Sequence, residues 1–247
     1  MNLSTISTAG KVIDENDLRS FSKCSEFYRR GGKDNITFGQ ELVQASIEKL
    51  FVKNLKKELK NPAADLQSTI LFSVKRINKN YNLLEPQINK NMNLAILWLK
   101  DFFNIFPLSK YITVLGPIEP VVKINKTPIK LYISGLFRSK ERQTIHAVTF
   151  SPYGTKHSIL NDPANILKIK MLQPFVQKHL QTNRSQVILH IFSFTKNGNL
   201  EYQLMDSNDI TSKKFETIKS LIKTMESDYR YPVIPCNHSC PFKKDCY

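Results

Sequence analysis

Residues 111–150 read YITVLGPIEPVVKINKTPIKLYISGLFRSKERQTIHAVTF, and this stretch decides which fold we expect. Apolar side chains, many of them β-branched or aromatic, alternate with polar ones, and this period of two is typical of half-buried strands. We therefore predict four consecutive strands, over residues 111–115, 121–124, 130–137 and 144–150.

Helical patterns precede these strands. Leu94, Trp98, Phe102 and Ile105 recur at intervals of three or four residues, which places them on one helix face. We expect Trp98 in the core rather than on a base-stacking surface. This spacing predicts a helix over residues 91–106, and similar spacing predicts helices over 17–30, 38–60 and 62–81. Gly31-Gly32 ends the first of these helices, and Pro62 opens the one over 62–81.

The C-terminal half continues the alternation of helices and strands. Pro163 opens a helix to about residue 181, and Lys196-Asn197-Gly198-Asn199 is a hairpin sequence between strands at 187–195 and 200–205. A helix over 212–226 follows. The fold class is therefore α/β, one domain over residues 1–247 with a helical region at about 16–106, a mixed-sheet core at about 107–226 and a cysteine-rich knuckle at 232–247.

The composition favours an anionic partner. Lys and Arg number 36 against 21 Asp and Glu, a net charge of +15, and an excess of this kind favours nucleic acid. The alternative is a lysine-rich surface that is merely solvated. No stretch reaches the roughly 18 apolar residues of a membrane helix, and the N-terminus lacks the features of a secretory signal. We expect a cytoplasmic protein without a membrane partner.

The four cysteines are unevenly distributed. Cys24 lies near the start, while Cys236, Cys240 and Cys246 fall within the last dozen residues. Thiolates so close in sequence can converge on one soft metal centre, with Cys24 as the remaining cysteine to complete it. A set of four thiolates suits a [4Fe–4S] cluster or tetrahedral zinc, and His238 could replace one thiolate on zinc. Unliganded thiols are the third possibility.

Two cysteine motifs resemble those of a known family. Ser22-Lys-Cys24-Ser-Glu-Phe-Tyr28 resembles the "S-x-C-P-x-x-Y" motif of the iron–sulfur exonucleases of the PD-(D/E)XK superfamily, which include CRISPR spacer-acquisition exonucleases and the AddB nuclease domain. Their C-terminal "C-x-x-C-P-x-x-x-x-C" matches from Cys240 to Cys246, with one extra residue after Cys236. The resemblance implies a restriction-endonuclease-like mixed sheet with an N-terminal helical insertion. It also implies a [4Fe–4S] cluster that joins the chain ends through Cys24, Cys236, Cys240 and Cys246, with zinc as the alternative.

The residues that cut nucleic acid in that family do not match. Such nucleases hold divalent cations between carboxylates, often with a His, and place a Lys beside them. At the corresponding positions this chain has Val43 for the His, Arg138 for the first Asp, and Thr149 to Ser151 for the second acid and the Lys. The "Q-x-x-x-Y" helix motif is absent, and Glu119 remains but cannot make a metal site alone. The resemblance therefore implies a degenerate nuclease with no catalytic residues, although an enzyme is not excluded.

Basic residues near the expected site fit backbone contacts, which carry little sequence information. We expect nucleic-acid binding by Arg29, Arg30, Lys130, Arg138, Lys140 and Arg142, with Arg138 inside the former metal pocket. The expected function is a non-catalytic DNA-binding accessory subunit in DNA processing, replication or recombination. It would take single strands or duplex ends and act beside a helicase or nuclease.

Two alternatives remain open at this point. The first is an active iron–sulfur exonuclease whose metal site has migrated to other carboxylates. The second is a protein-interaction module of a phage or mobile element, basic only incidentally.

Overall fold

The protein is represented by a computed structural model that describes residues 12–23, 37–59, 62–141, 144–152, 155–180, 186–195 and 199–226. The predicted cysteine ligands and three of the predicted basic residues lie outside these ranges. They are Cys24, Arg29, Arg30, Arg142, Cys236, Cys240 and Cys246. No helix within the described ranges is both long and apolar enough to cross a membrane.

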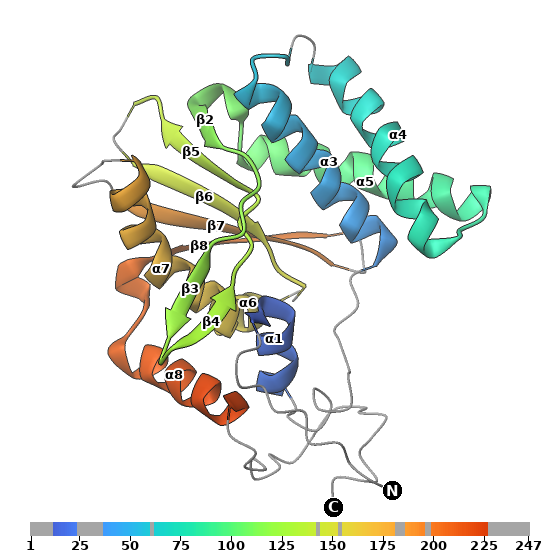
Figure 1. Cartoon of the computed structure of the whole chain (residues 1–247). Coiled ribbons are helices and arrows are strands. Elements are labelled where there is room, and N and C mark those ends of the chain that lie inside the picture. Colours follow the sequence, from blue (N-terminus) through green and yellow to red (C-terminus); the bar gives the residue numbers. More distant parts are fainter. Residues whose placement is uncertain are drawn as a thin grey trace, which may run out of the picture.

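A five-stranded sheet forms the centre of the molecule (Figure 1). Its strands, in spatial order, are β2 (Tyr111–Leu115), β5 (Gly135–Ser139), β6 (Ile145–Phe150), β7 (Val187–Phe194) and β8 (Leu200–Asp206). The β6–β7 pair is parallel and the other neighbours are antiparallel. The parallel pair is connected through α7 (Pro163–Leu180), since parallel neighbours need a crossover. The expected mixed sheet is confirmed.

A second, smaller sheet ties the N-terminal segment to the middle of the chain. Its order is β1 (Ile13–Asp14), β4 (Thr127–Lys130) and β3 (Val121–Ile124). The β3–β4 hairpin turns at Asn125 and Lys126, which have φ of 50° and 75°, as a tight hairpin turn requires. β1 pairs with β4 in parallel, Ile13 opposite Ile129. This pairing fixes where the next helix, α1 (Glu15–Lys23), begins.

One predicted strand is wrong. Residues 130–137 were expected as a single strand, but β4 ends at Lys130 and β5 begins at Gly135. Between them the chain passes from the small sheet to the large one, held by a bridge between Ile133 and Ile118. Buried side chains continue through this corner, so the sequence pattern does not register the change of sheet.

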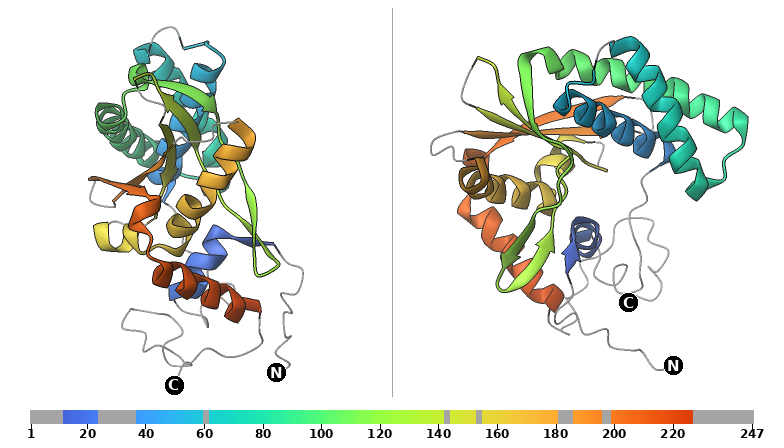
Figure 2. Two further views of the ribbon diagram at one scale, coloured as in Figure 1. Left: turned by 90° about the vertical axis from the view of Figure 1, so that its left-hand side faces the viewer. Right: turned by 45° about the horizontal axis from the view of Figure 1, so that its top comes forward.

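The helices cover the two faces of the large sheet. On one face lie α3 (Phe38–Leu55) and α5 (Glu85–Ile105), with α4 (Pro62–Tyr81) packed outside them; on the other lie α1, α7, α6 (Lys156–Leu160) and α8 (Ser212–Glu226) (Figures 1 and 2). The predicted bounds of α4 and α8 are confirmed. α3 ends earlier than expected, before Lys57 with its φ of 58°. α5 begins earlier, because Pro86 is tolerated in a first turn.

Each face has its own core. On the α3–α5 face it is aromatic, with Trp98 against Phe194 and Phe102 against Phe192. Trp98 is 1% exposed, so its predicted core position is confirmed. On the other face the core is aliphatic, and Phe21 of α1 and Met225 of α8 belong to it together. The N-terminal helical region is thus divided, because α1 packs with the C-terminal helices rather than with α3–α5.

Candidate functional site

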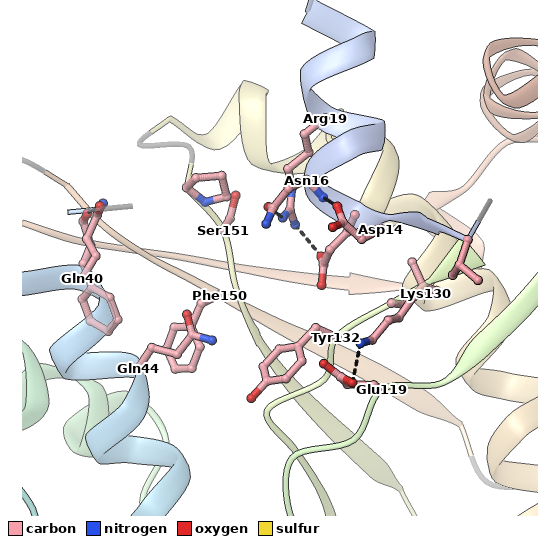
Figure 3. A pocket seen from close by; sticks show the side chains of 15 residues that line it. Asp14, Asn16, Arg19, Gln40, Gln44, Glu119, Lys130, Tyr132, Phe150 and Ser151 are labelled. Carbon is pink, nitrogen blue, oxygen red and sulfur yellow. Dashed lines mark hydrogen bonds and ion pairs between the residues drawn. The ribbon is translucent and has the colours of Figure 1, made fainter. Parts of the chain in front are cut away.

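A cavity of about 420 Å³ lies where α1, α3 and the two sheets meet (Figure 3). Figure 3 shows α1 on one side, α3 on the other, and the corner between β4 and β5 with the end of β6 between them. The charged residues of the lining are Asp14, Glu15, Arg19, Glu119 and Lys130. The polar and aromatic residues include Asn16, Gln40, Gln44, Tyr132, Phe150 and Ser151.

Local sequence positions α1 at the cavity. The Asp14 carboxylate accepts from the backbone N–H of Asn16 at 2.9 Å and of Asp17 at 2.8 Å, which is the geometry of an N-terminal helix cap. Since Asp14 is also the last residue of β1, the helix leaves the small sheet in a fixed direction. Glu15, Asn16 and Arg19 are thereby directed at the cavity.

A cluster of four ionisable side chains extends from the cavity lining, to which Glu15 and Arg19 belong, into the protein. Arg19 Nε donates to Asp162 at 2.8 Å, and Arg19 Nη2 donates to Glu15 at 2.8 Å. Lys168 Nζ of α7 contacts the same Glu15 carboxylate at 2.6 Å and donates to Thr149 Oγ1 of β6 at 2.6 Å. Two carboxylates and two cations leave the set neutral. We call Glu15, Arg19, Asp162 and Lys168 the ion cluster.

The ion cluster is buried, and this decides its electrostatics. The Lys168 and Asp162 side chains are 1% and 0% exposed. Burial works to raise the pKa of Glu15, but the charges of Lys168 and Arg19 together outweigh it and hold this pKa below its usual range. Burial lowers the pKa of Lys168, against the opposing effect of Glu15. Because an unpaired buried charge is costly, the four side chains are stable only as a set.

A second carboxyl lies behind the α3 wall. Glu48 accepts from Gln44 Nε2 and from Ser134 Oγ, both at 2.9 Å, and it also hydrogen-bonds Tyr132. Burial raises the pKa of Glu48. Two of its partners, Gln44 and Tyr132, line the cavity, so Glu48 orients the wall without facing the cavity itself.

The structure separates the predicted basic residues. Lys130 lines the cavity rim, where its ammonium lies 2.7 Å from Glu119, and both side chains are about half exposed. Arg138 pairs across the sheet with Ile145, at the opposite end of β6 from Phe150, and it does not line the cavity. Arg138 therefore lies away from this cavity. Its contact with nucleic acid stays a prediction.

Arg138 instead lies in an exposed basic group where β2 begins and β5 ends. It faces Ile112 of β2, and the Lys140 backbone N–H donates to the Lys110 carbonyl at 3.1 Å. The side chains of Lys110, Arg138 and Lys140 are all exposed. We call these three residues the β2–β5 basic edge.

The other positions expected to have lost metal ligands, Val43 and the segment from Thr149 to Ser151, also occupy different environments. Val43 is fully buried in the aromatic core, where it packs as an apolar residue. Thr149 contacts Lys168, and Ser151 lines the cavity. In the described ranges no group of three or more His, Cys, Asp or Glu residues could hold a metal ion.

Sequence reasoning missed most of the ion cluster. Glu15 and Arg19 are four residues apart in an amphipathic helix, and this spacing is as common on solvated faces as in buried pairs. Lys168 and Asp162 sit in a region whose sequence offers no recognised motif. Only the β1–β4 pairing, which brings α1 against α7, reveals the cluster.

Comparison with known proteins supports the fold. The structure is similar to the crystal structure of a "putative exonuclease" from Eubacterium rectale, with a TM-score of 0.53 and 10% sequence identity over 99% of this chain and 93% of that chain. No model of a known protein family and no curated protein matches the sequence. This chain therefore has a nuclease-like α/β fold with N-terminal helices.

Proposed function

We propose that this protein is a non-catalytic nucleic-acid-binding member of the nuclease-like fold, acting on DNA single strands or duplex ends. The observation that carries the proposal is the buried ion pair between the Lys168 ammonium and the Glu15 carboxylate. Divalent-metal hydrolysis of a phosphodiester needs carboxylates with free coordination positions. At this junction Glu15 and Glu119 are already paired with the protein's own cations.

The absence of catalysis is also supported by β6. Thr149 and Ser151 stand where the resemblance implies an acid and a Lys, and the Thr149 hydroxyl accepts a hydrogen bond from the Lys168 ammonium. A divalent ion would have to displace a buried ammonium from a pair in which each charge compensates the other. That exchange would require the free energy of desolvating the metal ion, and it would not supply the missing ligands.

Binding is supported by the excess positive charge of +15 and by the β2–β5 basic edge. Fluorescence anisotropy with a labelled single-stranded oligonucleotide at increasing salt tests it. Phosphate contacts predict that affinity falls steeply with salt and depends weakly on sequence. Absence of binding at low salt would instead leave the protein-interaction module as the function.

An active exonuclease with a relocated site is the second candidate. One observation favours it, because Asp14, Glu15 and Glu119 all line one cavity. Against it, Glu15 is held by Lys168 and Arg19, and Glu119 by Lys130. This candidate predicts metal-dependent cleavage that Asp14→Asn or Glu119→Gln abolishes.

We further propose a [4Fe–4S] cluster on Cys24, Cys236, Cys240 and Cys246, with zinc as the alternative. α1 ends at Lys23, one residue before Cys24, and α8 ends at Glu226, from which the tail continues to the other three cysteines. Phe21 and Met225, near the ends of these helices, share one core. The packing of α1 with α8 supports a centre shared by the segments that follow these helices, and the cluster would clamp the chain ends.

Anaerobically purified protein tests the cluster. About one cluster per chain would give brown protein with broad absorption near ~400 nm. Because ligand-site formation and folding are linked, Cys24→Ser and Cys240→Ser should lower metal content and solubility alike. Colourless protein with one zinc would select the alternative, and a Cys24→Ser variant with full metal content would rule out the split ligand set.

A further inference from the structure

The cavity is poorly suited to a phosphate. Its lining carries three carboxylates, Asp14, Glu15 and Glu119, against two cations, Arg19 and Lys130. Both cations are already in contact with carboxylates, at 2.8 Å and 2.7 Å. A phosphate inside would meet uncompensated negative charge. When DNA binds this protein, the DNA backbone should therefore lie on the basic exterior. The cavity itself suits an uncharged group.

Two amides present unused hydrogen-bonding atoms to the cavity. Glu48 accepts from Gln44 Nε2, so the Gln44 carbonyl oxygen is directed away from that carboxyl. Arg19 Nη1 donates to Asn16 Oδ1 at 3.3 Å, which leaves the Asn16 amide N–H groups as the exposed donors. Within the described ranges neither the Gln44 carbonyl oxygen nor the Asn16 amide nitrogen has a hydrogen-bond partner.

Charged neighbours fix which end of each amide faces the cavity. An amide nitrogen cannot accept from a guanidinium and an amide oxygen cannot donate to a carboxylate, so neither side chain can flip without losing its contact. One wall therefore offers an acceptor from α3 and the other offers donors from α1. Figure 3 shows Gln44 and Asn16 on these opposite sides.

A flat apolar surface lies beside the acceptor. Phe150 of β6 lines the cavity next to Gln44 and is itself stacked on Phe194, with ring centroids 5.5 Å apart and an interplanar angle of 25°. This stacking holds the Phe150 ring in place. An aromatic face with one acceptor and one donor matches a nucleobase, which presents a π-face and an edge with both hydrogen-bonding roles.

We infer that the cavity receives a single unpaired nucleobase, while the sugar–phosphate backbone stays outside on the basic surface. The inference rests on the proposed nucleic-acid-binding function and names the chemical group that enters this site. The volume of about 420 Å³ is within the roughly 300–1,000 Å³ of ordinary small-molecule sites. Every base has an edge with both roles, so the geometry selects unpaired bases over paired ones rather than one base over another.

The test compares two single strands of equal length and charge. One is a labelled 12-nucleotide oligothymidine, and the other has the same backbone with every base replaced by an abasic unit. Wild-type protein should bind the base-bearing strand roughly tenfold more tightly, the order expected for one stacked base. Since both strands carry the same phosphates, this ratio isolates the base.

Variants locate the effect in the cavity. Asn16→Asp keeps the acceptor for Arg19 but removes the donor, and Gln44→Leu removes the acceptor; each should bring the ratio close to one while the abasic strand binds as before. Asn89→Asp on α5 and Gln67→Leu on α4 make the same changes at exposed positions and should keep the wild-type ratio. The two cavity variants lie on different helices, and the wild-type comparison needs no variant.

Each result decides something different. Equal, tight binding of both strands by wild-type protein would overturn the base pocket and leave a phosphate-only binder. No binding of either strand at low salt would overturn the proposed function itself, and the pocket with it. A wild-type preference that Asn16→Asp and Gln44→Leu leave intact would place base recognition elsewhere and contradict the inference.

Discussion

On one face of the five-stranded sheet, Thr149 of β6 contacts the ion cluster; on the other, His146 of the same strand enters a chain of uncharged rings. His146 Nδ1 lies 2.7 Å from His190 Nε2, and His190 Nδ1 lies 2.9 Å from the Tyr202 hydroxyl. Burial, and then the neighbouring His146, lowers the pKa of His190 to about 3. Near neutral pH the hydrogen-bonded side chains of His146, His190 and Tyr202 are therefore uncharged. We call them the histidine chain.

The two faces satisfy buried polar groups by different means. The ion cluster relies on charge compensation, so its stability depends on every member being present. The histidine chain relies on hydrogen bonds between neutral groups inside an aromatic core, where Phe106 meets His190 edge to face at 4.9 Å. The stability that the ion cluster contributes should thus be sensitive to substitution. The stability that the histidine chain contributes should be sensitive to acid.

Loss of Lys168 should have the largest effect. Lys168→Met leaves Glu15 and Thr149 without their shared donor, and breaking a buried pair costs about 3–5 kcal/mol in the free energy of unfolding. Urea denaturation measures it. Lys219→Met, which breaks an exposed pair with Glu216, should cost less than about 1 kcal/mol. Equal losses in the two variants would show that the ion cluster is not a unit.

Mild acid should weaken the other face. The folded pKa of His190, about 3, lies below its unfolded value of 6.5, so the unfolded state binds more protons between them. The contribution of neutral His190 to the free energy of unfolding is complete above pH 6.5 and declines as pH falls, by about 2 kcal/mol at pH 5. His190→Gln should flatten the difference in urea stability between pH 8 and pH 5, while His157→Gln should not. An unchanged pH dependence in His190→Gln would contradict a neutral chain.

The sequence predicts some elements well because their signals are local. Pro62 and the apolar spacing set α4, and β2 and β3 have their predicted bounds. Lys130 and Gly135 were placed in one strand because an alternating pattern carries no information about which sheet receives it.

The candidate site was less predictable for the same physical reason. Arg138 was expected in the former metal pocket because it stands at the family's first Asp position, whereas the register Arg138–Ile145 places it at the end of β6 away from the cavity. The partners Glu15 and Lys168 meet only through a parallel pairing between chain segments far apart in sequence. Short motifs specify neither the register nor that pairing.

Charge reversal at the β2–β5 basic edge should affect binding without affecting either buried face. Arg138→Asp should weaken binding of single-stranded DNA roughly tenfold and reduce its salt dependence, because a phosphate contact is lost. It should not create nuclease activity, since Arg138 is remote from the cavity. Lys79→Asp on α4 makes the same charge change elsewhere. Equal weakening by both would indicate a diffuse charge effect instead of contact at this edge.

The rim pair should matter least for stability. Glu119 and Lys130 are 52% and 42% exposed in their side chains, so solvent screens their interaction. Glu119→Gln should change the free energy of unfolding by less than about 1 kcal/mol in the same urea assay. A loss as large as that of Lys168→Met would mean that the rim belongs to the buried set.

The central claim is that this protein binds nucleic acid without cutting it, and a nuclease digestion assay tests it most directly. A gel shift in the same buffer shows that the protein is bound to the nucleic acid during the digestion. Labelled single- and double-stranded DNA and RNA are incubated with purified wild-type protein in Mg²⁺ or Mn²⁺. The ion cluster and the absent ligands predict stable complexes with intact nucleic acid. Metal-dependent cleavage that Asp14→Asn or Glu119→Gln abolishes would contradict the account.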